Sequence, residues 1–311
     1  YSDGLVHVYN NDGNDITLDG ATLDIDGGEL RVGDAASDNT SDITITTGTL
    51  DISGGTVNIC DELDVANGTV TISGSGTLNI GTYTGSSNGS SADRFEMDAG
   101  TLNLTAGTIN IYGQNSSSSY EALDLASGVT VNANTNNTIN LAAGQGSNDE
   151  DMYMRVDGNE LGNLTIANAS YIVYTEDNVD LKGDLTITSG TFDLDHINNN
   201  LSLEGNLSIS GTLDANNQTI TFDGTASTSC PTISDPTLDI VVNKSSNGIV
   251  TFVGTNSFDE FTVTAGKAAM TSNTITADNT ISIADGAELE IGTGTFNADG
   301  AINANTSGEI D

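Results

Sequence analysis

A five-residue pattern recurs along the chain and limits its possible folds more than any other feature: glycine, threonine, an apolar residue, a polar residue and a second apolar residue. The stretch GTLDISGGTVNI (48–59) contains it twice. The pattern begins at Gly48, Gly55, Gly68, Gly76, Gly100, Gly107 and Gly190, and in looser form at Gly211 and Gly294. Neighbouring copies lie seven or eight residues apart, and a second spacing near 21 residues recurs. A fixed period of this length is the signature of a repeat architecture.

The pattern predicts short strands joined by sharp corners. Its alternation places Leu50 and Ile52 on one side of a strand and Asp51 on the other. Gly, Asn and Asp between strands allow the positive φ angles that corners need. Successive coils then pair in parallel about 4.8 Å apart. We therefore predict an all-β fold, a right-handed parallel β-helix (β-solenoid) with about three short strands per coil of 20–24 residues.

The apolar residues of the pattern are expected to stack as an interior ladder. The residues assigned to it are Leu50, Ile52, Val57, Ile59, Val70, Ile72, Leu78, Ile80, Leu102, Leu104, Ile109, Ile111, Leu185, Ile187, Phe261 and Val263. Aromatic residues make up 5% of the chain and Trp is absent, which favours an aliphatic core in thin layers. A β-sandwich fits less well because its strands recur every 8–12 residues through hairpins. Helical signals are nearly absent, and we expect 146–155 to be a loop.

A larger duplication is visible in the C-terminal half. Residues 164–190 align with 238–266, so that Leu185 falls on Phe261 and Gly190 on Gly266. The predicted regions are N-terminal coils with polar loops in 1–158, a repeat unit in 159–235 and a second copy of that unit in 236–311, together forming one continuous solenoid.

Polar segments interrupt the strand pattern. Those at 34–42, 85–93 and 113–119 are expected to be loops that leave the corners. The segment 224–237 contains Cys230 and both prolines of the chain. Because proline cannot donate to a strand ladder, we predict a break or bulge there.

The C-terminal half also carries a family resemblance. The stretches GNLTI, DLKGDLTITSGTFDL and NLSLEGNLSISGTLDANNQTITFDG resemble the β-strand repeats of bacterial secreted and cell-surface β-solenoid proteins, including the passenger regions of autotransporter-type adhesins. The likeness covers most of the chain. It implies a surface-exposed structural protein or adhesin, and its motifs are specific for the fold rather than for an activity.

The charge balance excludes several partners. The net charge is −38, and the six basic residues are scattered. They are Arg31, Arg94, Arg155, Lys182, Lys244 and Lys267. Without a basic patch to neutralise phosphates, nucleic-acid binding is not expected. No run of 18 apolar residues exists, so membrane insertion is not expected either. A chain that begins at Tyr1 without a signal peptide resembles a mature secreted protein, and we expect an extracellular or cell-surface location.

Calcium is the one cofactor that the sequence suggests. The stretch NNDGNDITLDG clusters four oxygen-bearing side chains, Asp12, Asn14, Asp15 and Asp19. A second acidic stretch lies at 147–151. Hard oxygen ligands suit Ca²⁺. Neither stretch has EF-hand spacing, and an acidic turn that binds only water is the alternative. We expect no other cofactor.

The two cysteines are far apart in the sequence. Cys60 follows the strand that ends at Ile59, so alternation places it outside or at a corner. Cys230 lies in the proline-containing segment and is also expected to be exposed. About eight coils separate them, roughly 40 Å along the axis, whereas a disulfide needs Cα atoms within about 7 Å. The alternatives are two inert thiols or an intermolecular disulfide from Cys60 of one subunit to Cys230 of a neighbour.

The sequence contains no recognisable catalytic constellation. Parallel β-helices include polygalacturonases and pectin lyases, but the Asn-Thr-Asp, Asp-Asp, Gly-His-Gly and Arg-Ile-Lys motifs of polygalacturonase-like enzymes are missing. His7 and His196 are the only histidines and stand far apart. We expect no enzyme and name no catalytic residue.

Three functions remain open. A solenoid ends in strand edges that can template association, and no amphipathic capping helix is evident. The leading hypothesis is a non-enzymatic extracellular structural protein whose partner is itself and which stacks end to end into a filament, sheath or surface layer. Fifteen or so coils would give a rod of about 70 Å per subunit. The alternatives are an adhesin stalk within a longer surface protein and a solenoid that binds or cleaves polysaccharide. Stacked aromatic residues would favour a glycan partner, but Tyr and Phe are scattered along the sequence.

Overall fold

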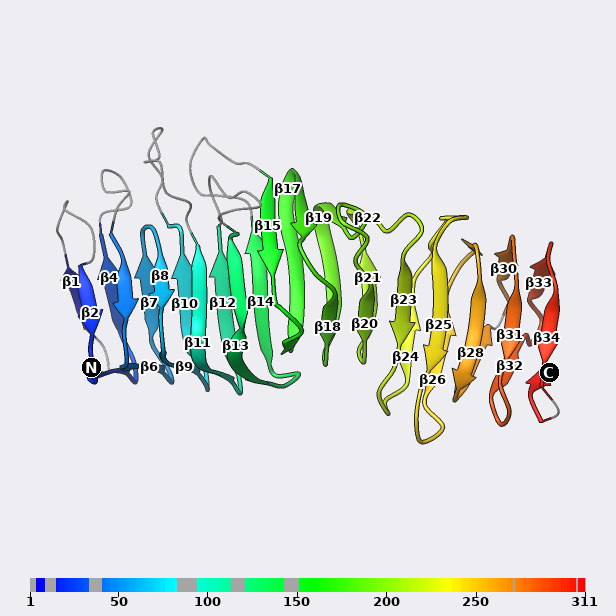
Figure 1. Cartoon of the computed structure of the whole chain (residues 1–311), viewed down its shortest axis with the longest axis horizontal. Helices are drawn as coiled ribbons and strands as arrows, with labels where there is room; N and C mark the ends of the chain where they lie inside the picture. The colour runs from blue at the N-terminus through cyan, green and yellow to red at the C-terminus, as the bar shows by residue number, and fades with distance from the viewer. Residues whose placement is uncertain are drawn as a thin grey trace.

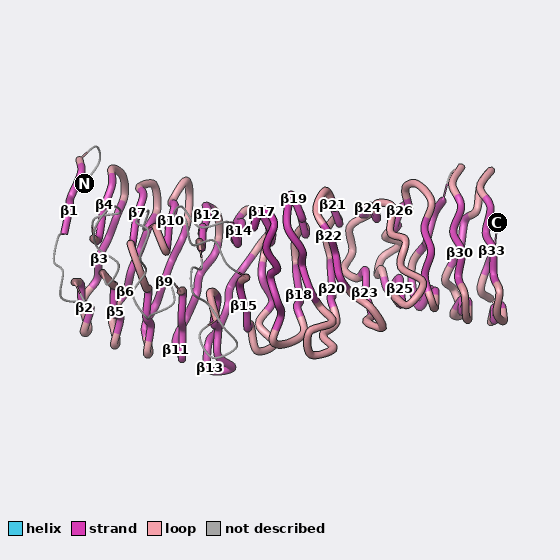
Figure 2. The backbone as a smooth tube through the Cα atoms, turned by 90° about the horizontal axis from the view of Figure 1, so that it is seen from above, coloured by secondary structure: helices cyan, strands magenta, loops and turns pink. Residues whose placement is uncertain are grey.

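The computed structural model of the chain is an elongated all-β rod, with the two ends of the chain at opposite ends of its long axis (Figure 1). It describes residues 4–8, 15–33, 41–82, 94–112, 121–142, 151–270, 272–305 and 307–310. These residues form strands β1 to β35 and contain no helix. The strands cross the rod axis, and each turn of the chain around the axis adds one coil (Figures 1 and 2).

Three faces of parallel strands run the length of the rod, and we call them faces X, Y and Z. Face X consists of β1 (Leu5–Val8), β4 (Glu29–Val32), β7 (Thr56–Ile59), β10 (Thr77–Ile80), β12 (Gly107–Ile111), β14 (Asn137–Ala142), the first parts of β17 (Asn163–Thr175) and β19 (Leu185–Asp193), β21 (Leu207–Ile209), β24 (Thr228–Cys230), β26 (Ile249–Phe252), β29 (Lys267–Met270), β32 (Glu288–Glu290) and β35 (Glu309–Ile310).

Face Y follows face X along the chain. It consists of β2 (Ile16–Leu18), β5 (Ile43–Ile45), β8 (Leu63–Val65), the first parts of β11 (Phe95–Leu104) and β13 (Leu123–Ala133), β15 (Met152–Arg155), the second parts of β17 and β19, β22 (Thr212–Asp214), β27 (Asn256–Phe258), β30 (Thr274–Ala277) and β33 (Thr295–Ala298).

Face Z completes each coil. It consists of β3 (Thr22–Ile25), β6 (Thr49–Ile52), β9 (Gly68–Ile72), the second parts of β11 and β13, β16 (Glu160–Leu161), β18 (Val179–Leu181), β20 (Leu201–Leu203), β23 (Thr219–Phe222), β25 (Asp239–Asn243), β28 (Phe261–Ala265), β31 (Ile281–Ile283) and β34 (Ile302–Ala304).

The strand register keeps equivalent residues of successive coils in line. Leu50 pairs with Val70, Val57 with Leu78, and Leu185 with Leu207, so the coil length at these places agrees with the predicted period. The sequence spacing is longer between Gly68 and its partner Gly100. The predicted all-β parallel β-helix with three short strands per coil is confirmed.

The alternation within each strand fills the interior. All sixteen residues assigned to the interior ladder are buried, and none is more than 1% exposed. Their outward neighbours form ladders of another kind. Asn79 donates to Asn58 at 2.6 Å, Asn110 to Asn79 at 2.7 Å and Asn140 to Asn110 at 2.7 Å. Each coil on this part of face X is thus held by apolar contacts inside and by amide hydrogen bonds outside.

The glycines of the repeated pattern are needed because a side chain would clash with the neighbouring coil, as well as because some of them have a positive φ angle. Gly55 has no positive φ, yet a Cβ there would lie 2.5 Å from Cγ2 of Ile25 in the preceding coil. Gly100 has φ +108°, and its Cβ would lie 2.0 Å from the carbonyl oxygen of Gly68. The glycines therefore let neighbouring coils approach closely at the corners.

The structure describes only part of the segments that were predicted to be loops. Residues 34–40, 85–93 and 113–119 of the expected loops lie outside the described residues. The expectation of a loop at 146–155 is wrong for its second half, because Met152–Arg155 is strand β15, with Met152 and Met154 buried. The acidic run before it hides this short alternation in the sequence.

The predicted break at the proline-containing segment is present. Faces X and Y lose their backbone ladders between β21 and β24 and between β22 and β27, where a single bridge joins Ser234 to Ser257. On face X the side chain of Asn206 accepts from the amide of Ser229 at 3.0 Å instead. Figure 2 shows the backbone leaving its regular path around β24 and β26. Only face Z continues through, from β20 to β23 and β25.

The strand pairing does not give the two predicted repeat units equivalent positions. Leu185 lies on face X, whereas its aligned residue Phe261 lies on face Z. The strands of face X that follow Leu185 are β21, β24, β26 and β29, and Phe261 falls between the last two of them. The two aligned stretches are therefore not separated by a whole number of coils. The two units therefore resemble each other in the sequences of individual strands, but the aligned strands lie on different faces of the rod. The boundaries at 158 and 235 stay a prediction.

Phenylalanine is concentrated beyond the break. Phe261 contacts Phe252, Phe258 and Phe296 with ring centroids 5.4, 6.1 and 5.7 Å apart. Lys244 is also fully buried there and donates from Nζ to the carbonyl oxygens of Glu204, at 2.8 Å, and Asp223. Burial lowers the pKa of Lys244, while the charges of Asp223 and Glu204 oppose that shift.

Candidate functional site

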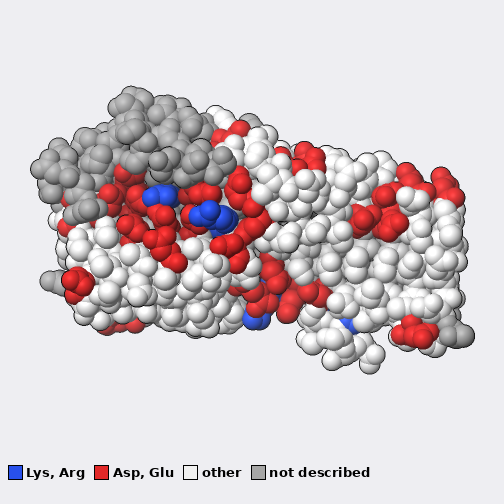
Figure 3. Space-filling view, viewed as in Figure 1, with Lys and Arg blue, Asp and Glu red and all other residues white. Residues whose placement is uncertain are grey.

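The outer surface of face Y carries a row of charged side chains. Asp64, Glu96, Asp124 and Arg155 occupy equivalent positions on successive coils, from β8 through β11 and β13 to β15. We call this row the acidic column. Figure 3 shows acidic side chains crowded around a few basic ones over the N-terminal half. Burial raises the pKa of both Asp64 and Glu96; the Asp98 charge adds to the shift, and the Arg94 charge opposes it.

Arg94 lies beside the acidic column and pairs with two carboxylates. It contacts Glu62 at 2.6 Å and also Glu96, and both Glu62 and Arg94 are largely buried. Burial raises the pKa of Glu62 to about 7; the Arg94 charge lowers it in part, and the charges of Asp42 and Glu96 raise it. Glu62 therefore exchanges its proton near neutral pH, unlike an exposed glutamate.

Arg155 closes the acidic column at β15. It makes a two-point contact with Asp124, from Nε at 2.8 Å and from Nη2 at 2.5 Å, and approaches Glu121 at 3.8 Å. Asp124 and Glu121 are only 3% and 4% exposed. Burial raises the pKa of Glu121, and Asp124 adds to that shift while Arg155 opposes it. This geometry gives the strong, oriented form of an arginine–carboxylate pair.

A cluster of aromatic rings lies next to Arg155 on the same face. The Tyr153 and Tyr174 rings, which are cross-coil partners, have centroids 4.8 Å apart, and His196 lies 4.7 Å from Tyr174. His196 Nε2 is also 3.6 Å from Glu176, whose backbone amide pairs with β15. Burial raises the pKa of both tyrosines, and Asp151 raises it further. The cluster joins three π faces to carboxylate oxygens on an outward surface.

The expectation that the aromatic residues are scattered missed this cluster. Tyr174 follows Tyr153 by one coil, and His196 follows Tyr174 by about one more. The period that predicted the fold could therefore also have placed these three rings together.

Three of the other basic residues form ion pairs along the rod. Arg31 contacts Glu29 at 2.7 Å, Lys182 contacts Glu160 at 2.6 Å, and Lys267 contacts Glu288 at 2.7 Å. Lys182 is close to Asp184 in the sequence, but its ammonium group contacts Glu160 on the preceding coil. The cations are spaced along the rod and neutralise local carboxylates, which does not create a surface for phosphates.

The calcium candidates are only partly described. Asp12 and Asn14 lie outside the described residues. Asp19 accepts a hydrogen bond from the Thr47 hydroxyl at 2.9 Å, and the amide of Asp15 donates to the carbonyl oxygen of Asp42 at 3.1 Å. Within the described ranges, no three His, Cys, Asp or Glu side chains are placed to hold a metal ion. In the second stretch, Asp151 accepts from the amide of Ile172 at 2.8 Å. Calcium binding stays a prediction.

The expected exposure of the cysteines is wrong. Cys60 and Cys230 are both 0% exposed. At the corner after β7 the chain turns, so Cys60 points inward like Ile59 and packs against Gly33. Cys230 lies on β24 with an inward side chain, and burial raises the pKa of its thiol. The intermolecular disulfide between Cys60 and Cys230 stays a prediction, but the described coils would have to open before either thiol could react.

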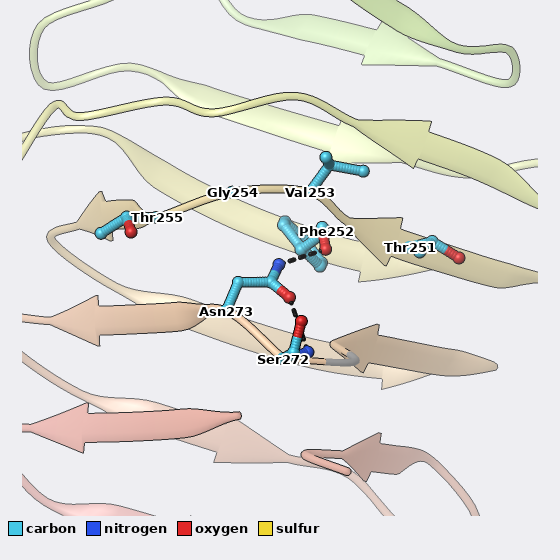
Figure 4. Close-up of a pocket in the computed structure, with 7 residues that line it drawn as sticks. All are labelled: Thr251, Phe252, Val253, Gly254, Thr255, Ser272 and Asn273. Carbon is cyan, nitrogen blue, oxygen red and sulfur yellow. Dashed lines mark hydrogen bonds between the residues drawn. The ribbon is translucent and has the colours of Figure 1, made fainter. Parts of the chain in front are cut away.

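Two hollows on the described surface are lined by neutral side chains. One of about 360 Å³ lies where β26 ends, between Thr251, Val253, Gly254, Thr255 and Asn273 and their neighbours (Figure 4). There the Asn273 amide donates to the carbonyl oxygen of Phe252, as Figure 4 shows. Another, of about 450 Å³, is lined by Thr, Ser and Gly of 188–191 and 210–212. Neither hollow offers a titratable group for acid–base chemistry.

The C-terminal end of the rod exposes apolar side chains. Ile302 and Ile310 are 56% and 43% exposed. Together with Phe296, Leu289 and Ile281 they line an apolar cavity of about 90 Å³. Among the described strands, β33, β34 and β35 are each the last member of their ladder. This end therefore offers unpaired strand edges around an incompletely covered core.

The architecture places the chain in the class of parallel β-helix proteins. Searches among protein families, curated proteins and solved structures found no match. None of the described segments is a helix of the length and apolarity that a membrane crossing requires.

Proposed function

We propose that the protein is a non-enzymatic, extracellular structural β-solenoid that associates with itself end to end into a filament, sheath or surface layer. The observation that carries the proposal is the C-terminal end of the rod, where Ile302 and Ile310 are exposed beside the apolar cavity. Inside the rod, the equivalent inward side chains are covered by the next coil. A further coil at this end would bury them and pair three open strand edges at once.

Repulsion between copies opposes this association. Each copy carries a net charge of −38, so two rods repel at low salt. The Debye length falls from about 30 Å at 0.01 M salt to about 3 Å at 1 M. Association is therefore expected to strengthen steeply with ionic strength, because the apolar contribution is unaffected by screening.

Sedimentation velocity of the full chain at the two salt concentrations tests the proposal, with negative-stain electron microscopy of the same samples. We expect monomers at low salt and rods of increasing length at high salt. A chain that stays monomeric at high salt and high concentration, with Ca²⁺ added as well, would overturn end-to-end assembly. A stalk within a longer surface protein would then be favoured, since its next coil would belong to the same polypeptide.

A second candidate function, glycan binding, rests on a different observation. Tyr153, Tyr174 and His196 form one aromatic cluster beside Glu176. Aromatic faces pack against the apolar faces of sugar rings, and carboxylates accept from sugar hydroxyls. Such a site would give the rod an adhesive side surface while its ends serve assembly.

Titration with cellohexaose and chitohexaose tests the second candidate. The chain has no Trp, so tyrosine fluorescence reports on the rings directly. We expect binding that weakens at least about tenfold, about 1.4 kcal/mol, in the double variant Tyr153→Leu/Tyr174→Leu. The variant Tyr112→Leu, directly after β12 of face X, is the control and should bind normally. No fluorescence change with either sugar, or equal loss in the control, counts against this site.

A further inference from the structure

The outer surface of face X carries two straight rows of uncharged side chains between β7 and β14. The first row consists of threonines that pair in register on successive coils, Thr56, Thr77, Thr108 and Thr138. The second row, two residues further along each strand, is the ladder of Asn58, Asn79, Asn110 and Asn140. Among the described residues of these four strands, no outward side chain is charged. We call this surface the threonine–asparagine face.

The lack of charge separates the threonine–asparagine face from other parts of the rod. The chain has 44 acidic residues, and the acidic column lies on face Y. Figure 2 shows β4, β7, β10 and β12 along one side of the rod and β5, β11 and β15 along the other. Charges return at β4, where Glu29 accepts from Asn58 at 2.8 Å and pairs with Arg31. The face therefore suits a neutral ligand that is rich in hydrogen-bonding groups.

The side chains of the face are held in place before any ligand binds. Each of them is half-buried between its neighbours in the row. Threonine is stiff at χ1, and each asparagine from Asn79 onward donates to the one on the preceding coil. An amide within the ladder still has a second N–H and a second oxygen lone pair for a ligand. Binding to this face therefore costs little conformational entropy.

The spacing of the two rows matches the repeat of ordered water. Successive coils are about 4.8 Å apart. In tetrahedrally bonded water with O–H···O distances of about 2.8 Å, two oxygens that share a neighbour lie about 4.6 Å apart. Over the three steps from β7 to β14, the two repeats differ by about 0.6 Å in total. This difference is small compared with the length of one hydrogen bond.

We propose that the threonine–asparagine face binds ice. The threonine hydroxyls and asparagine amides hold a layer of water in positions close to those of the lattice, and this layer joins the protein to the ice surface. A charged side chain would order water around itself instead, so the neutrality of the face is part of the proposal. The proposal is independent of end-to-end association because it concerns the side of the rod.

Uptake of the full chain into slowly growing ice at low salt tests the proposal. Protein is measured in the melted ice and in the remaining liquid, and we expect enrichment in the ice. The double variant Thr77→Tyr/Thr108→Tyr places two rings in the middle of the face and prevents close contact with a flat solid. Uptake should then fall at least about tenfold, because the rings introduce a clash.

The variant Thr221→Tyr/Thr262→Tyr is the matched control. Both threonines are outward and half-buried on strands of face Z, β23 and β28. The same substitutions there should leave uptake into ice unchanged. Circular dichroism at low salt verifies that both double variants are folded.

Three outcomes would overturn the proposal. The first is that ice excludes the unmodified chain, or takes up the chain and Thr77→Tyr/Thr108→Tyr equally. The second is that the face Z control loses uptake to the same extent. The third is that the unmodified chain sediments with microcrystalline cellulose but is excluded from ice, which would mean that the face recognises an ordered polysaccharide. Failure of the chain to assemble at high salt would leave this test unaffected.

Discussion

The two parts of the rod on either side of the proline-containing break fill the same coil architecture with different side chains. The N-terminal stack (residues 4–214) repeats aliphatic layers and ties its outer surface with the ladder of Asn58, Asn79, Asn110 and Asn140. The C-terminal stack (residues 219–310) holds five of the seven phenylalanines of the chain and the buried Lys244. Both have the same three faces. The coil architecture therefore tolerates large differences in its filling as long as the alternation of inward and outward residues is kept.

The largest expected effect comes from the phenylalanine cluster. Phe261→Ala removes a fully buried ring that contacts three others, and a change of this kind costs about 3–5 kcal/mol. Because repeat proteins are stabilised by neighbouring units, the loss should be confined to the C-terminal stack. Hydrogen exchange with mass spectrometry should show faster exchange there and little change in the N-terminal stack.

The matched change is Leu185→Ala, which should have the reverse distribution. If both variants accelerate exchange equally along the whole rod, the two stacks unfold as one unit and the distinction between them fails.

A corner glycine in the N-terminal stack gives the next largest effect. At Gly100 the added Cβ of alanine would meet the Gly68 carbonyl oxygen at 2.0 Å, and φ is +108°. The left-handed conformation costs about 1–2 kcal/mol and the overpacking about 1–3 kcal/mol more. Gly286 in the C-terminal stack has φ +77° with open space around it, so Gly286→Ala should show only the conformational cost. Denaturant unfolding measures both, and equal losses would refute the close-approach argument.

The two stacks should respond to pH in opposite directions. The folded pKa of Glu62 is raised to about 7 from 4.5. The fold then binds more protons than the unfolded chain between these values, so this contribution is complete below pH 4.5 and is lost as pH rises through 7. The difference is of order 1–3 kcal/mol. Glu62→Gln should flatten this slope in the N-terminal stack, as followed by hydrogen exchange at several pH values.

Lys244 makes the stability of the C-terminal stack depend on pH in the opposite direction. Its folded pKa lies below the ordinary value of 10.5, so the fold releases this proton before the unfolded chain does, and the stability of the C-terminal stack rises with pH toward 10.5. These assignments would be contradicted if both stacks showed the same dependence of stability on pH. They would also be contradicted if Glu62→Gln left the slope of that dependence unchanged.

The smallest effect concerns the asparagine ladder. Asn79→Thr keeps a side chain suited to a strand but removes the amide that donates to Asn58 and accepts from Asn110. The expected cost is about 0.5–1.5 kcal/mol. Thr77→Ser, two residues earlier on the same outer surface, is the control. A cost no larger than that of the control would mean that the ladder orders the surface without stabilising it.

The features that could be predicted from the sequence are those that repeat within one strand. The alternation of Leu50 with Ile52 needs only a period of two, and it predicted the faces and the interior ladder. Features that depend on the coil length were harder. The alignment of Leu185 with Phe261 looked like a duplicated unit, but the two residues fall on different faces. Tyr153 and Tyr174 looked scattered although they are one coil apart.

The other differences between prediction and structure have two causes: the turns at the corners, and the use of composition averaged over the whole chain. Alternation stops where the chain turns, so Cys60 points inward directly after the inward Ile59. The low aromatic content is an average over the whole chain, and it hid the concentration of phenylalanine around Phe261.

Cryo-electron microscopy of the high-salt assemblies tests the central claim most directly. The account predicts an uninterrupted strand spacing of about 4.8 Å along the filament axis. Rods that associate side by side, with that strand spacing perpendicular to the axis of the assembly, would contradict it.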